Sequence, residues 1–486
     1  MMGALLGKAL GFVREIQLAR HLGANVVADS LRGAMVAVLM PIAPLQGDLV
    51  PSTLVPLYNE WRSEQRSSRM MSSLCLAFVA IAATFAVLIA LFADSYVGLL
   101  VGGFGPEAQA VTVSFTRIMT LAMPASVLVA LFGCVEISLG KSRMTSIRAS
   151  VQNVSILIGI SVMSYTGHVT AIAWAFSVSM ILTALYGFAM LWREGELSPG
   201  DVSVKDSIDA FKVFALRARP LFLQPLCDQG NTFLEKTLSS VLVVGTMASL
   251  DYARTITDTV FYIVSLPIGY IILGQDKSTV IKDRFILLCR PLLHMALPAS
   301  AFMLIFSTDI IRLVFERGAF QAEAISLTSA SLQGISVGLW ATTLGWILVR
   351  MLNAQQRNRT AAMVFVYAYV GNMVTNVLTF SWLGPLGIGL GEAVRGMIIL
   401  AGTAYALGCS RLLVLLLVQT VPVTLTLGGA GLLVRDVFVT PLSRVLVGAA
   451  VYGVVLVPWF LLFVPEIAER VLRRVRRKSE LEALPP

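Results

Sequence analysis

The first membrane-length segment of the chain, residues 3–22, carries side chains that could recognise an anionic group. Its charged residues are Lys8, Arg14, Glu15 and Arg20 on an otherwise apolar helix. A charge in hydrocarbon costs about 2.5–3.5 kcal/mol even on insertion scales, so we expect this helix to line a polar cavity inside a bundle. An arginine guanidinium can donate two hydrogen bonds at once to a phosphate. The segment therefore indicates a site for a polar ligand within a membrane.

A second group of charged residues lies in the middle of the chain. Asp228 and Glu235 are seven residues apart, which places them on one face of a helix. Further charged residues within or beside predicted membrane helices are Asp29, Arg32, Lys236, Asp251, Arg254 and Asp258. We interpret the set as lining a cavity whose cations bind an anionic group such as a diphosphate. The alternative is internal pairing between helices, with Lys8 neutralising Glu15, or Lys236 and Arg254 neutralising Glu235.

The candidate substrate-binding residues are Lys8, Arg14, Asp29 and Arg254, and the candidates for coupling or gating are Asp228 and Glu235. We expect no catalytic residue and no enzyme activity, because the sequence contains no GxSxG, HExxH or P-loop motif. The five cysteines and three histidines are scattered, so we expect no metal site and no cofactor. Without an ATP site, the energy must come from an ion gradient, the membrane potential or downstream consumption. The sequence does not identify the coupling ion.

The elements that must position these residues are membrane helices. The chain is 57% hydrophobic and 13% charged, with a mean hydropathy of +0.80, which excludes an ordinary soluble protein. The net charge of +9 could suggest a nucleic-acid partner, but the basic residues gather in loops, and we expect no nucleic acid. We predict an all-α polytopic membrane protein with about fourteen transmembrane helices. The predicted spans are 3–22, 26–48, 72–101, 110–138, 147–165, 169–192, 219–243, 246–273, 287–308, 325–352, 360–382, 386–408, 411–434 and 445–465.

The order of features repeats along the chain and predicts a domain organisation. We predict an N-terminal six-helix lobe (1–193), a cytoplasmic linker (194–218), a second six-helix lobe (219–408), two further helices (409–466) and a basic cytoplasmic tail (467–486). Duplicated halves with a site between them are typical of secondary transporters. Lysine and arginine concentrate in alternate loops, which predicts a multi-pass protein with both termini in the cytoplasm.

Several segments, in order along the chain, resemble the MurJ/MviN family of lipid II flippases. They are LGFVREIQLAR (10–20), AIAWAFSVSMILTALY (171–186), LVFERGAF (313–320) and GPLGIGL (384–390). The resemblance implies a bacterial inner-membrane protein of the multidrug/oligosaccharidyl-lipid/polysaccharide (MOP) exporter superfamily. It also implies two six-helix lobes around a cationic cavity, working by alternating access. Such proteins move undecaprenyl-diphosphate-linked sugars from the cytoplasmic to the periplasmic leaflet, and their last two helices form a groove for the lipid tail.

The resemblance implies roles for individual residues by position. Arg14 and Asp29 match functional residues of the family's first two helices, and Lys8 stands where the family usually has arginine. Arg254 lies about one residue from an arginine of the family's eighth helix. The family's second helix ends near an arginine, whereas here no arginine occurs from 33 to 61. This departure leaves two candidate substrates, lipid II and an exopolysaccharide repeat unit.

Other classes of function remain as alternatives. An ion-coupled small-molecule or multidrug exporter of the same superfamily would use Asp228 and Glu235 as proton or sodium sites. A glycan polymerase or ligase would need a large extracytoplasmic loop, and the predicted loops are short. A scaffold that keeps the fold without transport is the remaining alternative. The expected partners of a flippase are its lipid-linked sugar, membrane lipid, and a glycan synthase or polymerase.

Overall fold

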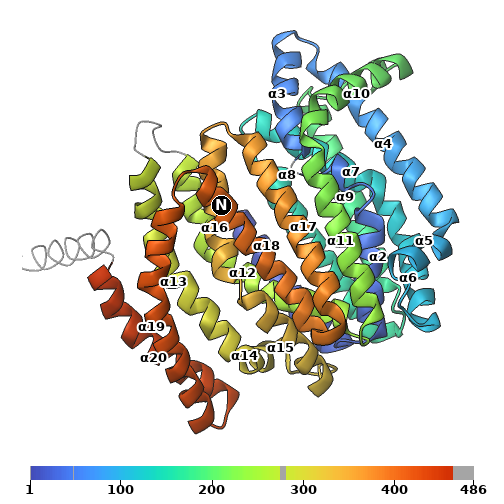
Figure 1. Cartoon of the computed structure of the whole chain (residues 1–486). Coiled ribbons are helices and arrows are strands. Elements are labelled where there is room, and N and C mark those ends of the chain that lie inside the picture. The colour runs from blue at the N-terminus through green and yellow to red at the C-terminus, as the bar shows by residue number, and fades with distance from the viewer. Residues whose placement is uncertain (1, 48, 274–280, 464–486) are drawn as a thin grey trace, which may run out of the picture. The chain divides into compact units, whose positions relative to one another are not determined.

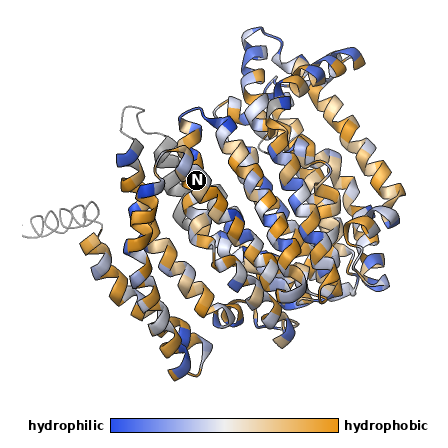
Figure 2. Cartoon of the chain, in the orientation of Figure 1, coloured by the Kyte–Doolittle hydropathy of each residue, from blue (hydrophilic) through white to orange (hydrophobic). Residues whose placement is uncertain are grey.

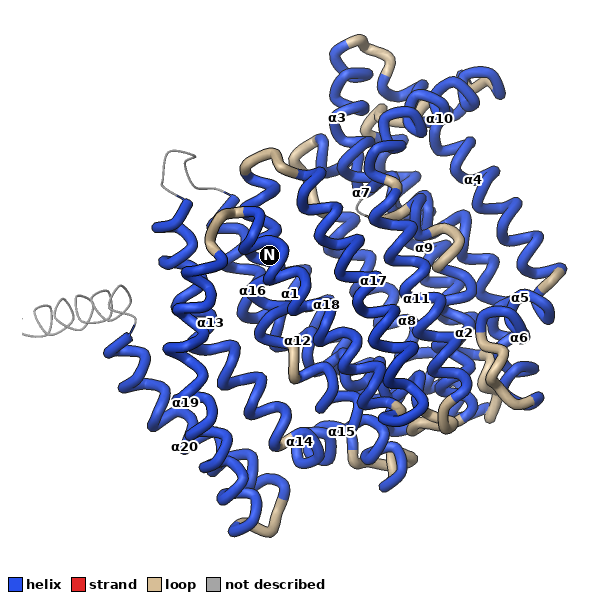
Figure 3. Tube along the Cα trace, viewed as in Figure 1, coloured by secondary structure: helices blue, strands red, loops and turns tan. Residues whose placement is uncertain are grey.

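The described part of the chain consists of helices joined by short loops, without a strand (Figures 1 and 3). The computed structural model describes residues 2–47, 49–273 and 281–463. The predicted basic tail, 467–486, lies outside these residues. The all-α fold class predicted from the sequence is confirmed.

The chain forms two compact units, which we describe separately. Unit 1 comprises Met1–Thr255 and Phe315–Leu327, and unit 2 comprises Ile256–Val314 and Thr328–Pro486. The predicted division into lobes at 193 and 219 follows the helix repeat rather than compactness, and it stays a prediction.

The helices of unit 1 begin at the N-terminus and continue into α12. They are α1 (Met2–Leu22), α2 (Val26–Leu39), η1 (Ala43–Leu45), α3 (Leu49–Ser63), α4 (Ser67–Leu91), α5 (Ala93–Leu100), α6 (Pro106–Met119), η2 (Thr120–Ala122), α7 (Met123–Ser138), α8 (Arg143–Thr166), α9 (Ala171–Arg193), η3 (Pro199–Asp201), α10 (Val204–Ala218), η4 (Arg219–Leu221), α11 (Leu223–Val241) and α12 (Thr246–Leu273).

The helices of unit 2 follow the first ten residues of α12. They are α13 (Ile281–Ile305), α14 (Ser307–Phe315), α15 (Ala322–Ser336), α16 (Leu339–Ala354), α17 (Asn358–Leu383), α18 (Pro385–Ala406), α19 (Ser410–Val437) and α20 (Pro441–Phe463). The last residue of α14, Phe315, and the first part of α15, up to Leu327, belong to unit 1.

Each of the fourteen predicted spans falls on a helix or on a broken pair of helices. Among the described residues, nine helices are long and apolar enough to cross a membrane, and up to eleven if each bent pair counts as one span. The exact count of fourteen therefore stays a prediction. Helices α1 and α11 miss this criterion because of their charged side chains, and both carry residues that the sequence nominated for the site. The sequence did not predict α3 and α10, which are amphipathic rather than uniformly apolar.

Unit 1 is a bundle in which charged helices are covered by apolar ones. Helix α1 packs against α8, α8 against α9, α2 against α6, and α4 against α7 and α10. Helix α4 is hydrophobic along most of its length (Figure 2). Its buried Phe78 makes edge-to-face contacts with Phe211 and Phe214 of α10, at ring-centroid distances of 5.8 and 5.2 Å. Such contacts hold α10 against the first half of α4.

One polar clamp at the end of α9 depends on a carboxylate outside the membrane spans. Glu194 accepts hydrogen bonds from Lys141 at 2.9 Å and Arg143 at 2.8 Å, which hold the pKa of its carboxyl below the ordinary value of 4.5. A carboxylate with a lowered pKa stabilises the fold above pH 4.5 and loses that contribution as the pH falls further. We expect Glu194→Gln to lower the melting temperature slightly at pH 7, because exposed ion pairs contribute little. The difference from wild type should shrink in detergent melts as the pH falls below 4.5 and through the lowered pKa of Glu194. A difference unchanged by pH would contradict the assignment.

Unit 2 has its apolar core among α13, α16, α17, α18 and α19. Helix α18 lies very close to the α15–α16 pair. A Cβ on Gly334 would lie 2.3 Å from the Leu386 carbonyl oxygen, and one on Gly338 would lie 2.3 Å from Ala393 Cα. Small residues let helix backbones approach in this way.

Candidate functional site

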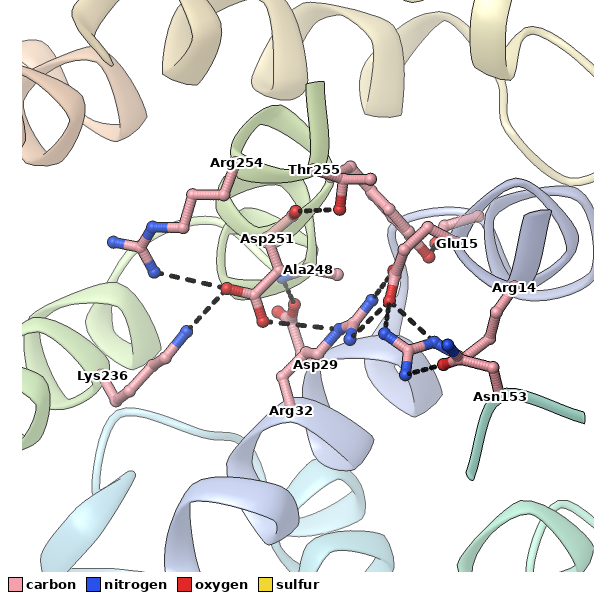
Figure 4. Close-up of polar contacts among 12 residues, drawn as sticks. Arg14, Glu15, Asp29, Arg32, Asn153, Lys236, Ala248, Asp251, Arg254 and Thr255 are labelled. Atoms are coloured by element: carbon pink, nitrogen blue, oxygen red, sulfur yellow. Dashed lines mark hydrogen bonds and ion pairs between the residues drawn. The ribbon is translucent and has the colours of Figure 1, made fainter. Parts of the chain in front are cut away.

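A buried to half-buried group of eight charged residues joins α1 and α2 to α11 and α12 within unit 1 (Figure 4, which labels all of them except Glu235). We call it the charge cluster. Its members are Arg14, Glu15, Asp29, Arg32, Glu235, Lys236, Asp251 and Arg254. Four are cations and four are carboxylates, so the formal charges cancel. Balanced pairing is what makes so many buried charges tolerable.

Arg32 lies at the centre of the charge cluster. Its guanidinium bonds Glu15 of α1 on one side and lies 3.5 Å from an Asp251 oxygen of α12 on the other. The same group lies over the ring of Tyr252, 5.6 Å from its centroid. The Arg32 residue is 7% exposed, so these contacts form away from water. Arg32 thereby links three helix segments that are far apart in sequence.

The other cations of α11 and α12 share carboxylates. Lys236 Nζ lies 3.1 Å from Asp251 Oδ1, and an Arg254 nitrogen lies 3.3 Å from the same oxygen. Arg254 also pairs with Glu235 at 2.5 Å, and Lys236 lies 3.8 Å from that carboxylate. The pairing of Glu235 with Lys236 and Arg254 is the internal neutralisation that the sequence offered as the alternative to ligand binding.

Arg14 extends the charge cluster to α8. It bonds Glu15 at 2.5 Å and donates to the side-chain oxygen of Asn153 at 2.9 Å. The Asn153 amide nitrogen in turn donates to the Gly7 carbonyl of α1 at 2.8 Å. Asn153 thus fixes both the backbone of α1 and the direction of Arg14.

Asp29 holds the first turn of α12. Its two carboxylate oxygens accept hydrogen bonds from the backbone N–H groups of Gly245 at 2.6 Å and Ala248 at 2.8 Å. The first N–H groups of a helix have no partner within the helix, so a carboxylate there both satisfies them and complements the helix dipole. The Asp29 residue is 2% exposed, so its described contacts are those of a cap that joins α2 to α12.

We expect Asp29→Asn to destabilise the protein by about 1–3 kcal/mol, because one amide N–H₂ would face a backbone N–H that then loses its acceptor. Thermal unfolding of the purified protein in detergent measures the change. The matched control is Asn25→Asp, since Asn25 caps α2 through its side-chain oxygen at 3.0 Å from Ala28 N, and a carboxylate serves there equally well. An Asp29→Asn protein that melts with wild type would contradict the capping role.

A tight corner lies beside the charge cluster, where the end of α1 meets two loops. We call residues 23–25, 243–248 and 315–320 the glycine corner. Tyr252 donates its hydroxyl to the Gly23 carbonyl at 3.0 Å, and its ring packs on Phe315 and Phe320. Ala319 N donates to the Arg20 carbonyl at 2.8 Å. The segment LVFERGAF (313–320) therefore contributes packing around α1, a role that the sequence pattern did not specify.

A cavity of about 410 Å³ opens beside the charge cluster. Its polar lining comes from Arg32, Lys236, Asp251 and Arg254, together with side chains of Gln46, Gln229 and Thr232. Asp251 and Arg254 are the more accessible of these charges, each with 22% of its side chain exposed. Its volume lies in the usual range for small-ligand sites. The cavity therefore offers three cations, and the Asp251 carboxylate with which each of them pairs, to a polar ligand.

The candidate residues from the sequence are only partly brought together. Arg14, Asp29, Glu235 and Arg254 all belong to the charge cluster. Lys8 lies exposed about two turns before Glu15 on α1, and Asp228 lies two turns before Glu235, where it accepts a hydrogen bond from Gln229 at 3.2 Å. The sequence candidates omitted Arg32, Lys236, Glu15 and Asp251. Their signal was present: Arg32 and Asp251 lie three residues from the chosen Asp29 and Arg254, and Glu15 and Lys236 lie next to the chosen Arg14 and Glu235.

The fold is that of an all-helical, multi-pass membrane protein that carries a charge cluster among its helices. The structure is similar to one described as "Lipid II flippase MurJ, inward closed conformation", with a TM-score of 0.82 and 18% identity, covering 94% of this chain and 98% of that one. It is also similar to an inward-facing multidrug resistance MATE family transporter of the MOP superfamily, with a TM-score of 0.67 and 15% identity, covering 83% of this chain and 95% of that one.

The sequence matches the family described as "Lipid II flippase MurJ" over residues 18–452, and the chain belongs to this family. A probable lipid II flippase MurJ of Rickettsia prowazekii is 22% identical over 406 residues, which cover 80% of this chain and 78% of that protein. One of Treponema pallidum is 22% identical over 419 residues, covering 81% and 78%. The family is one of transporters in the bacterial inner membrane, as the sequence resemblance implied.

Proposed function

We propose that this chain carries lipid II, a polyprenyl-diphosphate-linked glycan, from the cytoplasmic to the periplasmic leaflet by alternating access. The observation that carries the proposal is the cavity beside the charge cluster, where Lys236 and Arg254 share one Asp251 oxygen. Membership in the MurJ family supports the lipid-linked substrate. No bond is made or broken in this function.

The proposed binding step is an exchange of partners. A diphosphate that enters the cavity offers several oxygens to two cations that otherwise share one carboxylate oxygen. Arg254 would bind it through two parallel N–H groups, and Lys236 would bind it as a point charge. Once Lys236 and Arg254 leave Asp251 for the diphosphate, Arg32 is the cation that remains paired with the Asp251 carboxylate. Substrate binding would thereby change the ion pairing between α2 and α12.

The proposed conformational step is opening of the glycine corner. If the N-terminus is cytoplasmic, as the positions of Lys and Arg predict, then the end of α1 and the glycine corner lie on the periplasmic side. Hydrogen bonds of Asp29 with Gly245 and Ala248 join segments that belong to different predicted lobes. Release of the substrate toward the periplasm would require these hydrogen bonds of Asp29 to break. We propose that the change in ion pairing at Asp251 weakens them.

Complementation tests the proposed substrate. We expect the wild-type chain to support growth of bacteria depleted of their own lipid II flippase, and Arg254→Ala and Arg14→Ala to abolish that support at equal membrane abundance. The matched control is Arg117→Ala, because Arg117 is an exposed cation that pairs with Asp94 outside the charge cluster. A well-inserted wild-type chain that gives no growth would exclude lipid II. An exopolysaccharide repeat unit on the same type of carrier would then be the substrate to assay in vesicles.

The fold similarity to a MATE transporter favours one second candidate function, the export of small molecules driven by an ion gradient. That function would use the carboxylates Asp228 and Glu235 as ion sites. It predicts gradient-dependent efflux from vesicles and drug sensitivity on deletion, neither of which a flippase of lipid-linked sugars requires. In the structure Glu235 pairs with Arg254, which favours a structural or gating role for this carboxylate.

A further inference from the structure

A cavity of about 260 Å³ lies within unit 2, among α12, α15, α16, α17 and α18. We call it the aromatic cavity, because four of the side chains that line it are aromatic. They are Phe261, Trp346, Phe365 and Tyr369. The buried aliphatic side chains of Ile335, Leu339 and Ile399 line it as well. Its volume is below the range usual for drug-sized ligands, so the aromatic cavity suits a small group.

The aromatic rings of this cavity are held in place by one another. Phe261 meets Trp346 edge to face, with ring centroids 5.7 Å apart, and Phe365 stacks on Tyr369 with centroids 6.3 Å apart. The Arg350 guanidinium lies over the Trp346 ring, 4.5 Å from its centroid. An aromatic face attracts a cation through the quadrupole of the ring. The rings that line the aromatic cavity offer the same attraction to a cation that enters it.

Carboxylates outnumber cations in the lining of the aromatic cavity. Its charged side chains are Asp258 of α12 and Glu392 and Arg395 of α18. Arg395 lies 3.7 Å from Glu392, one turn along the same helix, and Asp258 is exposed. The cavity beside the charge cluster has the opposite balance, with three cations and one carboxylate in its lining. The aromatic cavity therefore disfavours a diphosphate and favours a cation.

The lining favours an organic cation over a metal ion. A hard cation such as calcium takes about 6–8 oxygen ligands. Among the residues that the structure describes, no group of three or more His, Cys, Asp or Glu side chains is placed to hold a metal ion. An alkylammonium ion has different needs, because its charge pairs with a carboxylate while its carbon atoms pack on aromatic and aliphatic side chains. The aromatic cavity provides both kinds of contact.

Two walls of the aromatic cavity are held in place by close helix packing. A Cβ on Gly396 of α18 would lie 2.2 Å from Thr342 Oγ1 of α16, and a Cβ on Gly371 of α17 would lie 2.2 Å from Ile398 Cδ1 of α18. Helices α16 and α17 are therefore both packed closely against α18. A ligand that binds between such walls has little structure to order, which lowers the cost of binding.

We propose that the aromatic cavity is a binding site for a small organic ammonium ion. The carboxylates of Asp258 and Glu392 supply the opposite charge, and the rings of Phe365 and Tyr369 supply cation–π and apolar contact. Free amines and the headgroup of phosphatidylethanolamine both carry such an ammonium group. The site goes beyond the proposed transport function and does not depend on it, since it lies in unit 2 and uses no residue of the charge cluster.

Direct binding of radiolabelled choline to the purified full-length protein in detergent tests the site. We expect saturable binding that unlabelled tetramethylammonium displaces. The neutral analogue of choline, in which carbon replaces the nitrogen, has the same shape without the charge and should displace little. Sodium ions at the same concentration as tetramethylammonium should also displace little. Together these competitors identify the ligand by its charge and by its organic groups.

Two variants test whether choline binds in the aromatic cavity. Asp258→Asn removes a charge and should weaken binding about tenfold, since contacts to a charged partner are the stronger ones. Phe365→Leu removes a ring but keeps apolar bulk, and should weaken binding about threefold, as expected for one cation–π contact. The matched controls are Asp209→Asn, at an exposed carboxylate of α10, and Phe188→Leu, at a ring that stacks on Trp192. Both controls should bind choline like wild type, and thermal unfolding shows whether each variant is folded.

The composition of the membrane identifies the source of the ammonium group. Choline binding is measured in vesicles of phosphatidylglycerol alone and in vesicles that also contain phosphatidylethanolamine. A Kd for choline that rises with the share of phosphatidylethanolamine assigns the site to this lipid headgroup. A Kd that is the same in both kinds of vesicle assigns the site to a free amine.

Four results would overturn the proposal. Binding that neither variant changes would place choline elsewhere on the protein. Displacement by sodium as effective as that by tetramethylammonium would indicate a site for inorganic cations, and equal displacement by the neutral analogue would indicate an apolar pocket. The fourth is the absence of saturable binding both in detergent and in phosphatidylglycerol vesicles. None of these results bears on the growth assay of the proposed function, so the two proposals fail separately.

Discussion

Replacing Arg32 by alanine should destabilise the protein by about 3–5 kcal/mol and abolish transport, the usual consequence of removing one partner from a buried ion cluster. Arg32 bonds Glu15 and lies 3.5 Å from Asp251, so its loss leaves the charge cluster with an uncompensated negative charge. Thermal unfolding in detergent and the complementation assay measure the two effects. Arg32→Lys should be intermediate, because lysine keeps the charge but cannot contact both carboxylates with one planar group.

A double variant identifies the cause of that loss. Adding Glu15→Gln to Arg32→Ala restores neutrality, so the double variant should be more stable than Arg32→Ala alone. The non-additivity of such a cycle measures the interaction between the two residues. Arg32→Ala protein with wild-type stability, or double variants whose losses simply add, would show that the pair does not hold the charge cluster together.

Gly245→Ala should have the second largest effect, by preventing the glycine corner from closing. Gly245 has φ +93°, a conformation that side chains rarely adopt, and an added Cβ would lie 2.4 Å from the Ala24 carbonyl oxygen. The backbone strain alone costs about 1–3 kcal/mol, and the clash must move α2 or α12 in addition. We expect loss of transport and increased accessibility of a cysteine placed at Ala248 to a membrane-impermeant thiol reagent.

Gly167→Ala is the matched control for this prediction. Gly167 ends α8 with φ +74°, and an added Cβ there would meet nothing within 4 Å. It therefore carries the conformational cost without the clash, and its transport should remain close to wild type. If the two variants lose activity equally, backbone strain explains the effect and close approach at the corner does not.

The sequence predicted the helices and part of the charge cluster for a clear physical reason. Charges are conspicuous in apolar segments, so Arg14, Glu235 and Arg254 could be chosen without a structure. The distances between these residues could not be predicted. Helical spacing shows which residues share a face of one helix, but it does not show which faces of different helices pack together. Lys8 shows the limit, since it shares a face with Glu15 by spacing but lies exposed two turns away.

The parts that the sequence did not predict depend on tertiary contacts. The capping of α12 by Asp29 joins residues more than 200 positions apart. The local sequence around Asp29 or around Gly245 does not predict this contact. The glycine corner depends on three positive-φ glycines, Gly23, Gly245 and Gly318, whose neighbours come from other segments. Helices α3 and α10 were missed because a search for long apolar runs does not detect amphipathic segments.

The division of the charge cluster between the start and the middle of the chain has a consequence for biogenesis. Helices α1 and α2 leave the ribosome carrying Arg14, Glu15 and Arg32, long before α11 and α12 supply Asp251 and Lys236. Within α1 and α2, Glu15 pairs with both Arg14 and Arg32, while the Asp29 carboxylate lacks the backbone N–H groups of Gly245 and Ala248, so these incompletely paired charges must be stabilised by the translocon or an insertase until the later helices arrive. Chains truncated before α11 should therefore be substrates for membrane quality-control proteases, although every helix of α1–α9 is already complete.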